Sequence, residues 1–560
     1  MPDTKTTSPR TDSQRVMGLS IGEYLIRRLQ EFGVRDAFGI PGDYILGFYS
    51  MLEKSPINVV GCCREDNAGF AADAYARLNG IGAVCVTYGV GGLSLCNSIA
   101  GAYAEKSPVV VISGSPGMRE RHNNPLLHHK VRDFQTQREV FDKICVATAE
   151  LTDPTIAFRD IDRVLTTCLR TKRPVYIELP RDMVRVTPDV AYEYRSQEPT
   201  SDPEALAEAV GEAARIIGDC RQPVIVAGVE IHRYGLQDEL LNFAESTRIP
   251  IACTITGKSV VPEKHPLFAG LYEGAMSRAE VTRFVEESDC VLLLGTFMTD
   301  IDMGIYTANL DPARCIYAVS DDLRIRHHHY HDVLLGDFIR ALTARRPQPP
   351  ERLPPAPRDR DGQKFQLQPE RPLTIMRLIE RLNQSLDNRT IVISDIGDAL
   401  FASTELTTHG RTEFICPAYY TSMGFGVPGA VGAATARPDV RTVVIVGDGA
   451  FQMTGNELST IVRHGHHCVV IVLDNKGYGT ERVLHAGEFK YNEVHSWAYH
   501  KLPEVFCGGK GYEVRTEGDF DRALSQAWND RQMHLIQAHL PPDDCSPPLR
   551  RLAEHLCKRV

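Results

Sequence analysis

The chain has 560 residues, which is long enough for about three domains of ordinary size. Apolar residues make up 43% of it and charged residues 24%, so the large buried cores of a globular protein are expected. The formal net charge of −10 argues against a general nucleic-acid-binding surface, because such a surface needs an excess of basic residues.

The start of the chain is polar and lacks the apolar core of a signal peptide, so residues 1–17 are predicted to be a disordered tail. No apolar run in the sequence is long enough to cross a membrane. Several of the 15 cysteines, among them Cys85, Cys290 and Cys468, lie within apolar stretches, as reduced core residues do. We therefore expect a cytoplasmic protein that binds neither membranes nor nucleic acid.

Residues 18–188 predict a first α/β domain. Ser20 and Glu23 have the spacing of a capping box, which begins a helix that Gly33 ends. Short apolar segments then alternate with helical segments, and this alternation predicts a doubly wound parallel sheet. The predicted strands are residues 36–40, 58–63, 83–88, 109–113 and 175–180, and the predicted helices are residues 68–78 and 93–103.

Two further blocks repeat this pattern. Residues 204–344 predict a central α/β domain, and residues 345–372 contain so many prolines that they predict an extended linker. Residues 373–545 predict a third α/β domain, and residues 546–560 a final helix. The predicted strands are residues 223–229, 249–254, 290–295, 314–319, 390–394, 441–446, 468–473 and 535–538. The expected fold class is α/β, with three doubly wound parallel-sheet domains.

The third domain carries the strongest functional signal. Asp448, within a Gly-Asp-Gly turn, follows the predicted strand 441–446, and Asn475 follows the predicted strand 468–473, with a helix near residues 456–464 between them. Neighbouring parallel strands end at the same edge of a sheet, which is where ligands bind. We therefore expect the two side chains to lie together.

These residue types suit a metal ion and a phosphate. Asp448 and Asn475 offer oxygen ligands, and Gly447 and Gly449 allow the backbone to come close to a phosphate. Oxygen ligands with a diphosphate suit octahedral Mg²⁺. The alternative is a tight strand-to-helix turn that binds no ligand.

Gly-Asp-Gly with a downstream Asn after a second apolar strand resembles the signature of enzymes that use thiamine diphosphate. The resemblance implies that the side chains of Asp448 and Asn475 and the backbone carbonyl of Gly477 hold Mg²⁺. It also implies that the first domain binds the pyrimidine of the cofactor and the third domain binds its diphosphate.

A thiamine enzyme also needs a carboxylic acid against the pyrimidine N1′ atom, which promotes the imino form that deprotonates the thiazolium. Glu65 follows the predicted strand 58–63, and residues 63–80 (CREDNAGFAADAYARLNG) resemble the segment of the family that carries this acid. The alternative is that Glu65 complements the dipole of the helix it precedes. The resemblance implies that this glutamate serves the site of a partner subunit.

Four further residues resemble the proton-handling set of the non-oxidative 2-oxo-acid decarboxylases, the family of pyruvate, indolepyruvate and phenylpyruvate decarboxylases. They are Asp43, His128, His129 and Glu481. The alternatives are a solvated histidine pair and a turn-forming aspartate. The resemblance runs from about Gly18 to the C terminus. Within the family, the motif sequences are most similar to those of the phenylpyruvate decarboxylases.

The same resemblance implies further cofactor contacts. Met423 would support the bent cofactor, and the carbonyl of Thr421 would accept a hydrogen bond from its 4′-amino group. Asp398, Ala450 and Phe451 would lie near the diphosphate. Some relatives have a hydroxyl residue where this chain has Ala450, so that contact would be absent here.

The substrate pocket is inferred from the family's geometry. Thr480 is smaller than the apolar residue that many relatives have before Glu481, which leaves room for a ring or a long chain. The remaining lining is expected from Ile396, Ala399, Leu484, Leu552 and Leu556. This favours aromatic or long-chain 2-oxo acids over pyruvate.

Three alternatives accompany this interpretation. The closest is a thiamine-dependent carboligase of the acetolactate-synthase kind, and the second is a non-catalytic relative that only binds the cofactor. The third concerns the histidine-rich residues 326–331, which resemble a metal patch, although consecutive histidines do not converge like spaced ligands. The family resemblance implies a homo-oligomer, at least a dimer with its site between subunits, and a tetramer.

Overall fold

The computed structural model describes residues 15–194, 199–320, 322–350, 353–357, 365–410, 413–485 and 487–556. Most of the predicted disordered tail, and residues 351–352 and 358–364 of the predicted linker, lie outside the described residues. The chain divides into two compact units. The first comprises Met1–Glu198, Val427–Asp439 and Thr454–His466, and the second comprises Pro199–Gly426, Val440–Met453 and His467–Val560.

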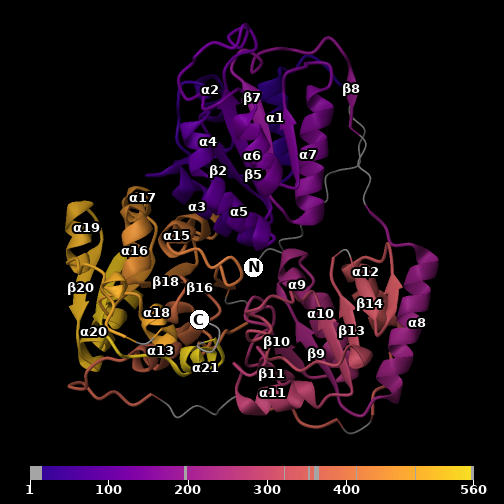
Figure 1. Cartoon of the computed structure of the whole chain (residues 1–560), viewed down its shortest axis with the longest axis vertical. Coiled ribbons are helices and arrows are strands. Elements are labelled where there is room, and N and C mark those ends of the chain that lie inside the picture. The colour runs from indigo at the N-terminus through magenta and orange to yellow at the C-terminus, as the bar shows by residue number, and fades with distance from the viewer. Residues whose placement is uncertain are drawn as a thin grey trace. The chain divides into compact units, whose positions relative to one another are not determined.

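The first unit is built on a parallel sheet of six strands, drawn in indigo to magenta in Figure 1. Its inner strands are buried on both faces and apolar, as parallel strands covered by helices are. In spatial order the strands are β3 (Asn58–Gly61), β2 (Asp36–Gly39), β4 (Gly82–Val86), β5 (Val109–Ser115), β7 (Val175–Pro180) and β6 (Ala147–Glu150).

The helices of this unit follow the predicted alternation. The predicted capping box begins α1, where the Ser20 side chain accepts from the Glu23 amide and Glu23 accepts from the Ser20 amide. The helices are α1 (Ile21–Glu31), α2 (Leu46–Leu52), α3 (Glu65–Asn79), α4 (Val90–Ser94), α5 (Cys96–Ala104), α6 (Thr136–Ile144), α7 (Ala157–Thr171), α15 (Gly426–Ala436) beyond its first residue, the 3₁₀ turn η2 (Gly455–Glu457) and α17 (Leu458–Arg463). A short antiparallel pair is formed by β1 (Arg15–Val16) and β8 (Tyr192–Glu193). It connects the beginning and the end of the part of this unit that precedes residue 199.

The second unit contains two more sheets (Figure 1). The central sheet is ordered β11 (Phe268–Leu271), β10 (Ile251–Cys253), β9 (Pro223–Ala227), β12 (Cys290–Leu294), β13 (Cys315–Ala318), β14 (Leu323–Ile325) and β15 (His328–Tyr330). The third sheet is parallel throughout and is ordered β17 (Glu413–Ile415), β16 (Thr390–Ser394), β18 (Arg441–Gly447), β19 (Cys468–Asp474), β21 (His534–His539) and β20 (Lys510–Val514).

The described residues of the second unit form twelve α-helices. They are α8 (Pro203–Asp219), α9 (Val229–Arg233), α10 (Gln237–Thr247), α11 (Ala279–Glu286), α12 (Leu335–Arg345), α13 (Ile375–Asn383), α14 (Asp398–Ser403), α16 (Asp448–Thr454, to Met453), α18 (Gly479–Leu484), α19 (Leu502–Val505), α20 (Glu517–Trp528) and α21 (Pro547–Leu556). In α21 the predicted apolar face is confirmed, because Leu549 and Leu552 are buried and Leu556 packs beside them. Across the described ranges, no helix is both long enough and apolar enough to cross a bilayer.

The central sheet departs from the expected parallel arrangement at one end. β14 pairs antiparallel with β13, and β15 pairs antiparallel with β14. This hairpin includes most of the histidine-rich segment, in which His328 pairs with Glu212 at 3.0 Å and His329 with Asp322 at 3.8 Å. Its strands are three residues long and partly exposed, so they lack the apolar run that a buried parallel strand shows.

The helix predicted near residues 456–464 is confirmed as α17, but a further helix that precedes it was not predicted. α16 begins at Asp448, directly after β18, and a 3₁₀ turn separates it from α17. The Gly-Asp-Gly residues predict a turn at this position, and the structure has a helix there. Gly449 instead permits close packing, since a Cβ there would lie 2.6 Å from the Tyr478 ring, and an acidic residue in the first turn complements the helix dipole.

Candidate active site

The carboxyl edge of the third sheet gathers the predicted metal ligands. β18 and β19 are neighbouring parallel strands, so Asp448 and Asn475 follow two adjacent strand ends. Asp448 is 1% exposed, and its carboxylate accepts hydrogen bonds from the amides of Gly449 at 2.7 Å and Gly477 at 3.1 Å. Burial raises the pKa of Asp448 to about 6. A cation bound here would favour the ionised carboxylate.

The backbone after Asn475 adopts two unusual conformations. Lys476 has φ +62° and Gly477 has φ +151°. A Cβ on Gly477 would lie 1.9 Å from the carbonyl oxygen of Asn492, so only glycine fits this turn. The close packing accounts for a glycine at the position of the predicted backbone ligand.

Polar atoms that lack protein partners lie near this turn. Oδ1 of Asp474 and both amide atoms of Asn492 are buried without a hydrogen-bond partner in the described part of the chain. The carbonyl of Asn492 accepts from the Tyr478 amide at 3.0 Å, which holds Asn492 against the turn. Buried polar atoms without partners are expected where a polar ligand binds. Together with Asp448 and Asn475, whose oxygens suit Mg²⁺, they fit a metal ion with a diphosphate.

The residues predicted to approach the diphosphate begin at the same strand end. Gly447 has open space where a Cβ would lie, whereas Gly449 packs against Tyr478. Ala450 and Phe451 follow in α16 and are 5% and 0% exposed. The open backbone at Gly447 is therefore the most accessible of these positions.

Asp398 has a partner that the sequence did not predict. It begins α14, and its carboxylate accepts hydrogen bonds from the amide of Ser546 at 2.9 Å and from the Ser546 hydroxyl. Burial raises the pKa of Asp398 to about 6. The residue therefore connects α14 to the segment that precedes α21.

A buried acid that sequence reasoning missed holds the loop with Thr421 and Met423. Asp395 is 0% exposed, and its carboxylate accepts from the amides of Gly424 at 3.1 Å and Gly426 at 2.8 Å. Burial raises the pKa of Asp395 to about 6. Its position directly after β16, at the carboxyl edge of the sheet, is the signal that could have identified it.

The first unit presents Glu65 at the start of a helix. Glu65 is the first residue of α3 and is half-buried. A Cβ on Gly91, in α4, would lie 3.7 Å from Oε1 of Glu65, so α4 leaves space beside this carboxyl group. The turn between β3 and α3 positions the side chain.

Three of the four predicted proton-handling residues meet in the first unit. Asp43 follows β2, and His128 and His129 lie in the loop between β5 and α6. Nε2 of His128 lies 2.7 Å from Oδ2 of Asp43, and one ligand-type atom from each of the three residues lies within 4.8 Å of the others. Tyr44 stacks on His128 with ring centroids 4.8 Å apart. The fourth residue, Glu481, belongs to the second unit, where it is exposed on α18.

The predicted substrate-lining residues lie on α14, α18 and α21 and in the turn before α14. The position of a Cβ on Gly397 is 3.2 Å from Oγ1 of Thr480, so the turn that follows Ile396 adjoins α18. Leu552 packs in an apolar cluster with Phe401 of α14, and Leu556 packs against that cluster. Ala399 is buried in the core of the third sheet, and Leu484 is half-buried on α18.

Three family models match this chain in order. They are the N-terminal TPP binding domain of thiamine pyrophosphate enzymes over residues 19–140, the central domain over residues 210–344 and the C-terminal TPP binding domain over residues 395–538. Indole-3-pyruvate decarboxylase of Azospirillum brasilense is 34% identical over 550 residues, which cover 96% of this chain and 98% of the relative. Alpha-keto-acid decarboxylase of Mycolicibacterium paratuberculosis is 35% identical over 546 residues, 95% of this chain and 96% of the relative. Pyruvate decarboxylase of Aspergillus fumigatus is 32% identical over 563 residues, 97% of each chain.

The chain belongs to the thiamine-diphosphate-dependent 2-oxo-acid decarboxylase family. The expected family and the α/β fold are thereby confirmed. The three matches fall on the three large sheets in chain order.

This decarboxylase contains a second buried acid that sequence reasoning missed. Glu457 ends η2 and is 0% exposed. Its carboxylate accepts hydrogen bonds from the amide of Cys63 and the side chain of Asn67, which lie on either side of Glu65. The sequence offered no local signal, because the contact joins residues 394 positions apart.

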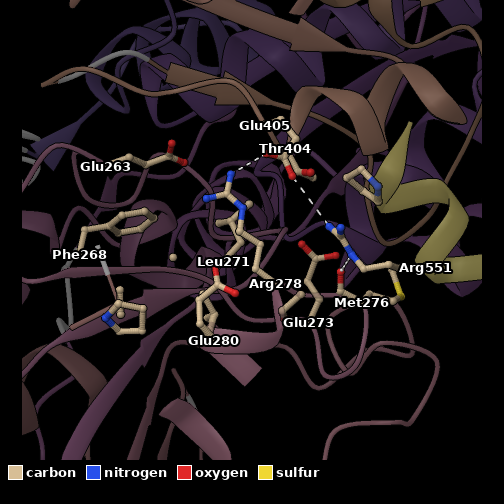
Figure 2. A pocket seen from close by; sticks show the side chains of 16 residues that line it. Glu263, Phe268, Leu271, Glu273, Met276, Arg278, Glu280, Thr404, Glu405 and Arg551 are labelled. Carbon is tan, nitrogen blue, oxygen red and sulfur yellow. Dashed lines mark hydrogen bonds and ion pairs between the residues drawn. The ribbon is translucent and has the colours of Figure 1, made fainter. Parts of the chain in front are cut away.

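The decarboxylase also has a small pocket of about 40 Å³ in its second unit, lined by residues of the central and third domains. Figure 2 shows Arg278 and Arg551 directed toward Glu405. Arg278 lies 2.5 Å from Glu405 and Arg551 lies 3.8 Å from it. Nε of Arg551 also donates to the carbonyl of Met276 at 2.7 Å. These contacts anchor α21 to the loop that follows β11.

Proposed function

We propose that this protein catalyses the non-oxidative decarboxylation of an aromatic or long-chain 2-oxo acid to an aldehyde and CO₂, with thiamine diphosphate and Mg²⁺ as cofactors. Membership of the family makes it a carbon–carbon lyase, a 2-oxo-acid carboxy-lyase. Indole-3-pyruvate decarboxylase is among its relatives, which supports an aromatic substrate.

The observation that carries the proposal is the meeting of Asp43, His128 and His129. An aldehyde is released only after a carbon atom of the intermediate is protonated, so a decarboxylase needs a proton donor at its site. A carboligase needs a second carbonyl substrate at that stage instead. The 2.7 Å contact between His128 and Asp43 provides an imidazole paired with a carboxylate, which favours proton transfer.

The cofactor contacts follow from the donors at the carboxyl edge of the third sheet. Asp448, Asn475 and the carbonyl of Gly477 would hold Mg²⁺, and the backbone at Gly447 would approach the diphosphate. When bound, thiamine diphosphate supplies the electron sink for the loss of CO₂. The role of Glu65 is to hold a proton at the pyrimidine N1′ atom.

The remaining residues act on the substrate. Asp43, His128, His129 and Glu481 deliver the proton that precedes aldehyde release. Thr480, beside the turn that follows Ile396, leaves space for a ring or a long chain. The apolar cluster under α21 excludes water from this side of the site.

We also propose a homo-oligomer whose sites lie between subunits, with at least a dimer and a tetramer as the expected assembly. A cytoplasmic location is part of the same proposal. It is supported by the cysteines of the described residues, all of which are free thiols.

The proposal is tested by measuring CO₂ and aldehyde formed from phenylpyruvate, with thiamine diphosphate and Mg²⁺ present, withheld or removed by a chelator. Cofactor-dependent CO₂ with an equal yield of phenylacetaldehyde is the expected result. Equal CO₂ with a hydroxyketone product would instead support a carboligase. The same assay with indolepyruvate, 4-methyl-2-oxopentanoate and pyruvate tests the substrate class, and a clear preference for pyruvate would contradict it.

A further inference from the structure

Among the described residues of the first unit, the Glu457 carboxylate accepts several hydrogen bonds but has no ion-pair partner. It accepts from the Cys63 amide at 3.1 and 3.2 Å, from Nδ2 of Asn67 at 2.6 Å and from the Thr460 hydroxyl at 2.5 Å. Among the described residues, no lysine, arginine or histidine pairs with it, and burial raises its pKa. Burying a carboxylate in this way costs free energy that only the hydrogen bonds offset.

The donors to Glu457 lie on either side of Glu65. Cys63 precedes it by two positions and Asn67 follows it by two. Arg64, the residue before the helix, donates to the Asp66 carboxylate but does not cap the backbone amides of α3. Helices usually begin with such a cap. Glu457, from a distant part of the chain, connects the turn before α3 to the side chain of the third residue of the helix.

We infer that Glu457 is a positioning residue for Glu65. It fixes the turn from which the Glu65 side chain extends, and so sets the place where that carboxyl group holds its proton. This inference rests on the proposed role of Glu65. A displacement of about 1 Å in a reacting group can cost about 100-fold in rate, so a loosened turn should be visible in kcat.

Two substitutions distinguish the effect of the hydrogen bonds of Glu457 from the effect of its negative charge. Glu457→Gln keeps an oxygen that can accept from the Cys63 amide, and its new amide group can donate to Oδ1 of Asn67, which is buried without a partner. Glu457→Leu fills the same space and removes every acceptor. We expect kcat to fall less than about threefold in Glu457→Gln and about 30- to 100-fold in Glu457→Leu.

The decisive comparison is a double-mutant cycle with Glu65→Gln. If Glu457 acts through Glu65, Glu457→Leu lowers kcat in the wild-type background but by less than about twofold in the Glu65→Gln background. A general loss of stability would lower kcat by the same factor in both backgrounds, and that result overturns the inference. Should Glu457→Leu not fold, Asn67→Ala takes its place in the cycle.

A second measurement uses the protein without cofactor. Hydrogen–deuterium exchange of a peptide over residues 58–70 should accelerate at least tenfold in Glu457→Leu and stay at the wild-type rate in Glu457→Gln, because the Cys63 amide keeps its acceptor only in the latter. A peptide over α7 should be unchanged in both. Unchanged exchange of residues 58–70 in Glu457→Leu would overturn the inference. Wild-type turnover in Glu65→Gln would overturn the proposed role of Glu65 itself. If Glu65→Gln loses turnover but Glu457→Leu has the same effect in the wild-type and Glu65→Gln backgrounds, only the inference about Glu457 is overturned.

Discussion

The two adjacent imidazoles of the first unit differ in their surroundings. The His128 side chain is 58% exposed and hydrogen-bonded to Asp43. His129 has φ +66°, and its Nδ1 is buried without a partner within the described ranges. A Cβ on Gly89 would lie 2.2 Å from the His129 carbonyl oxygen, so glycine at position 89 permits this strained backbone. His128 is therefore the more exposed of the two imidazoles.

This difference leads to a prediction for His128→Ala. Removing a positioned acid–base group typically lowers a rate by about 100-fold or more, so kcat for aldehyde release should fall by about that factor. The matched control is His122→Ala, an exposed histidine of the same loop, which should keep wild-type turnover. Steady-state aldehyde formation checks both variants, and equal activity of His128→Ala and His122→Ala would contradict the proton-handling role.

Another histidine sets a pH dependence of stability. His534 is 0% exposed, and burial lowers its pKa from 6.5 to about 4. The unfolded chain therefore gains a proton as the pH falls below about 6.5, while the folded chain gains it only near 4. Stability should fall as the pH decreases between these values, by at most about 1.4 kcal/mol per pH unit from this residue.

Thermal unfolding of the cofactor-free protein at pH 6.5, 5.5 and 4.5 measures this effect. His534→Gln should lose less of its melting temperature over this range than the wild type does. His122→Gln, which changes an exposed histidine, should follow the wild type. The same slope in all three proteins would show that His534 titrates normally in the folded chain.

Among the secondary-structure elements, the C-terminal helix links the central and third sheets of the second unit. α21 contacts both α14 and α18, and Arg551 connects it to Met276 and Glu405. Because α18 carries Thr480 and Glu481, the position of α21 affects the predicted substrate pocket. A loosened α21 should weaken substrate binding more than it changes the chemical step.

We therefore predict that Arg551→Ala raises KM for the 2-oxo acid about tenfold, which corresponds to about 1.4 kcal/mol, with a smaller change in kcat. The neighbouring Arg550 is exposed, and Arg550→Ala is the matched control that should leave KM unchanged. Steady-state kinetics with phenylpyruvate measure both constants. If Arg551→Ala and the control have the same KM, the position of α21 does not affect substrate binding.

The predicted elements also show where sequence patterns fail. The described strands that the sequence did not predict are β1, β6, β8, β11, β14, β15, β17 and β20, and all lie at or next to the edge of a sheet. Edge strands here are short or partly exposed, as in β20, where only Val514 is buried. Such strands are stabilised by pairing with a neighbour, so an apolar run is not required.

At the scale of the whole molecule, the proposed site needs residues from both units of the chain. Glu65 belongs to the first unit and Asp448 to the second. If each site combines Glu65 of one subunit with Asp448 of another, two inactive variants should complement each other. A mixture of Glu65→Gln and Asp448→Asn proteins, unfolded and refolded together in equal amounts, should regain about a quarter of wild-type turnover, because half of the random dimers have one intact site of two.

Each variant refolded alone is the control and should stay inactive. Size-exclusion chromatography with light scattering confirms that mixed oligomers have formed. If mixed oligomers form without any regained turnover, both residues must act within one chain. That result would contradict the proposed site between subunits while leaving the proposed reaction intact.

The amino-acid sequence alone determined the family, the α/β class and the order of the sheets, because these depend on local features. Apolar periodicity predicted the buried strands, and Gly-Asp-Gly with a downstream Asn marked two adjacent strand ends. The tertiary structure decided which distant residues meet. It placed His128 on Asp43, 85 positions away, and Glu457 on Cys63, 394 positions away. Such contacts depend on how loops and helices pack around the sheets, and no local pattern of residues records that packing.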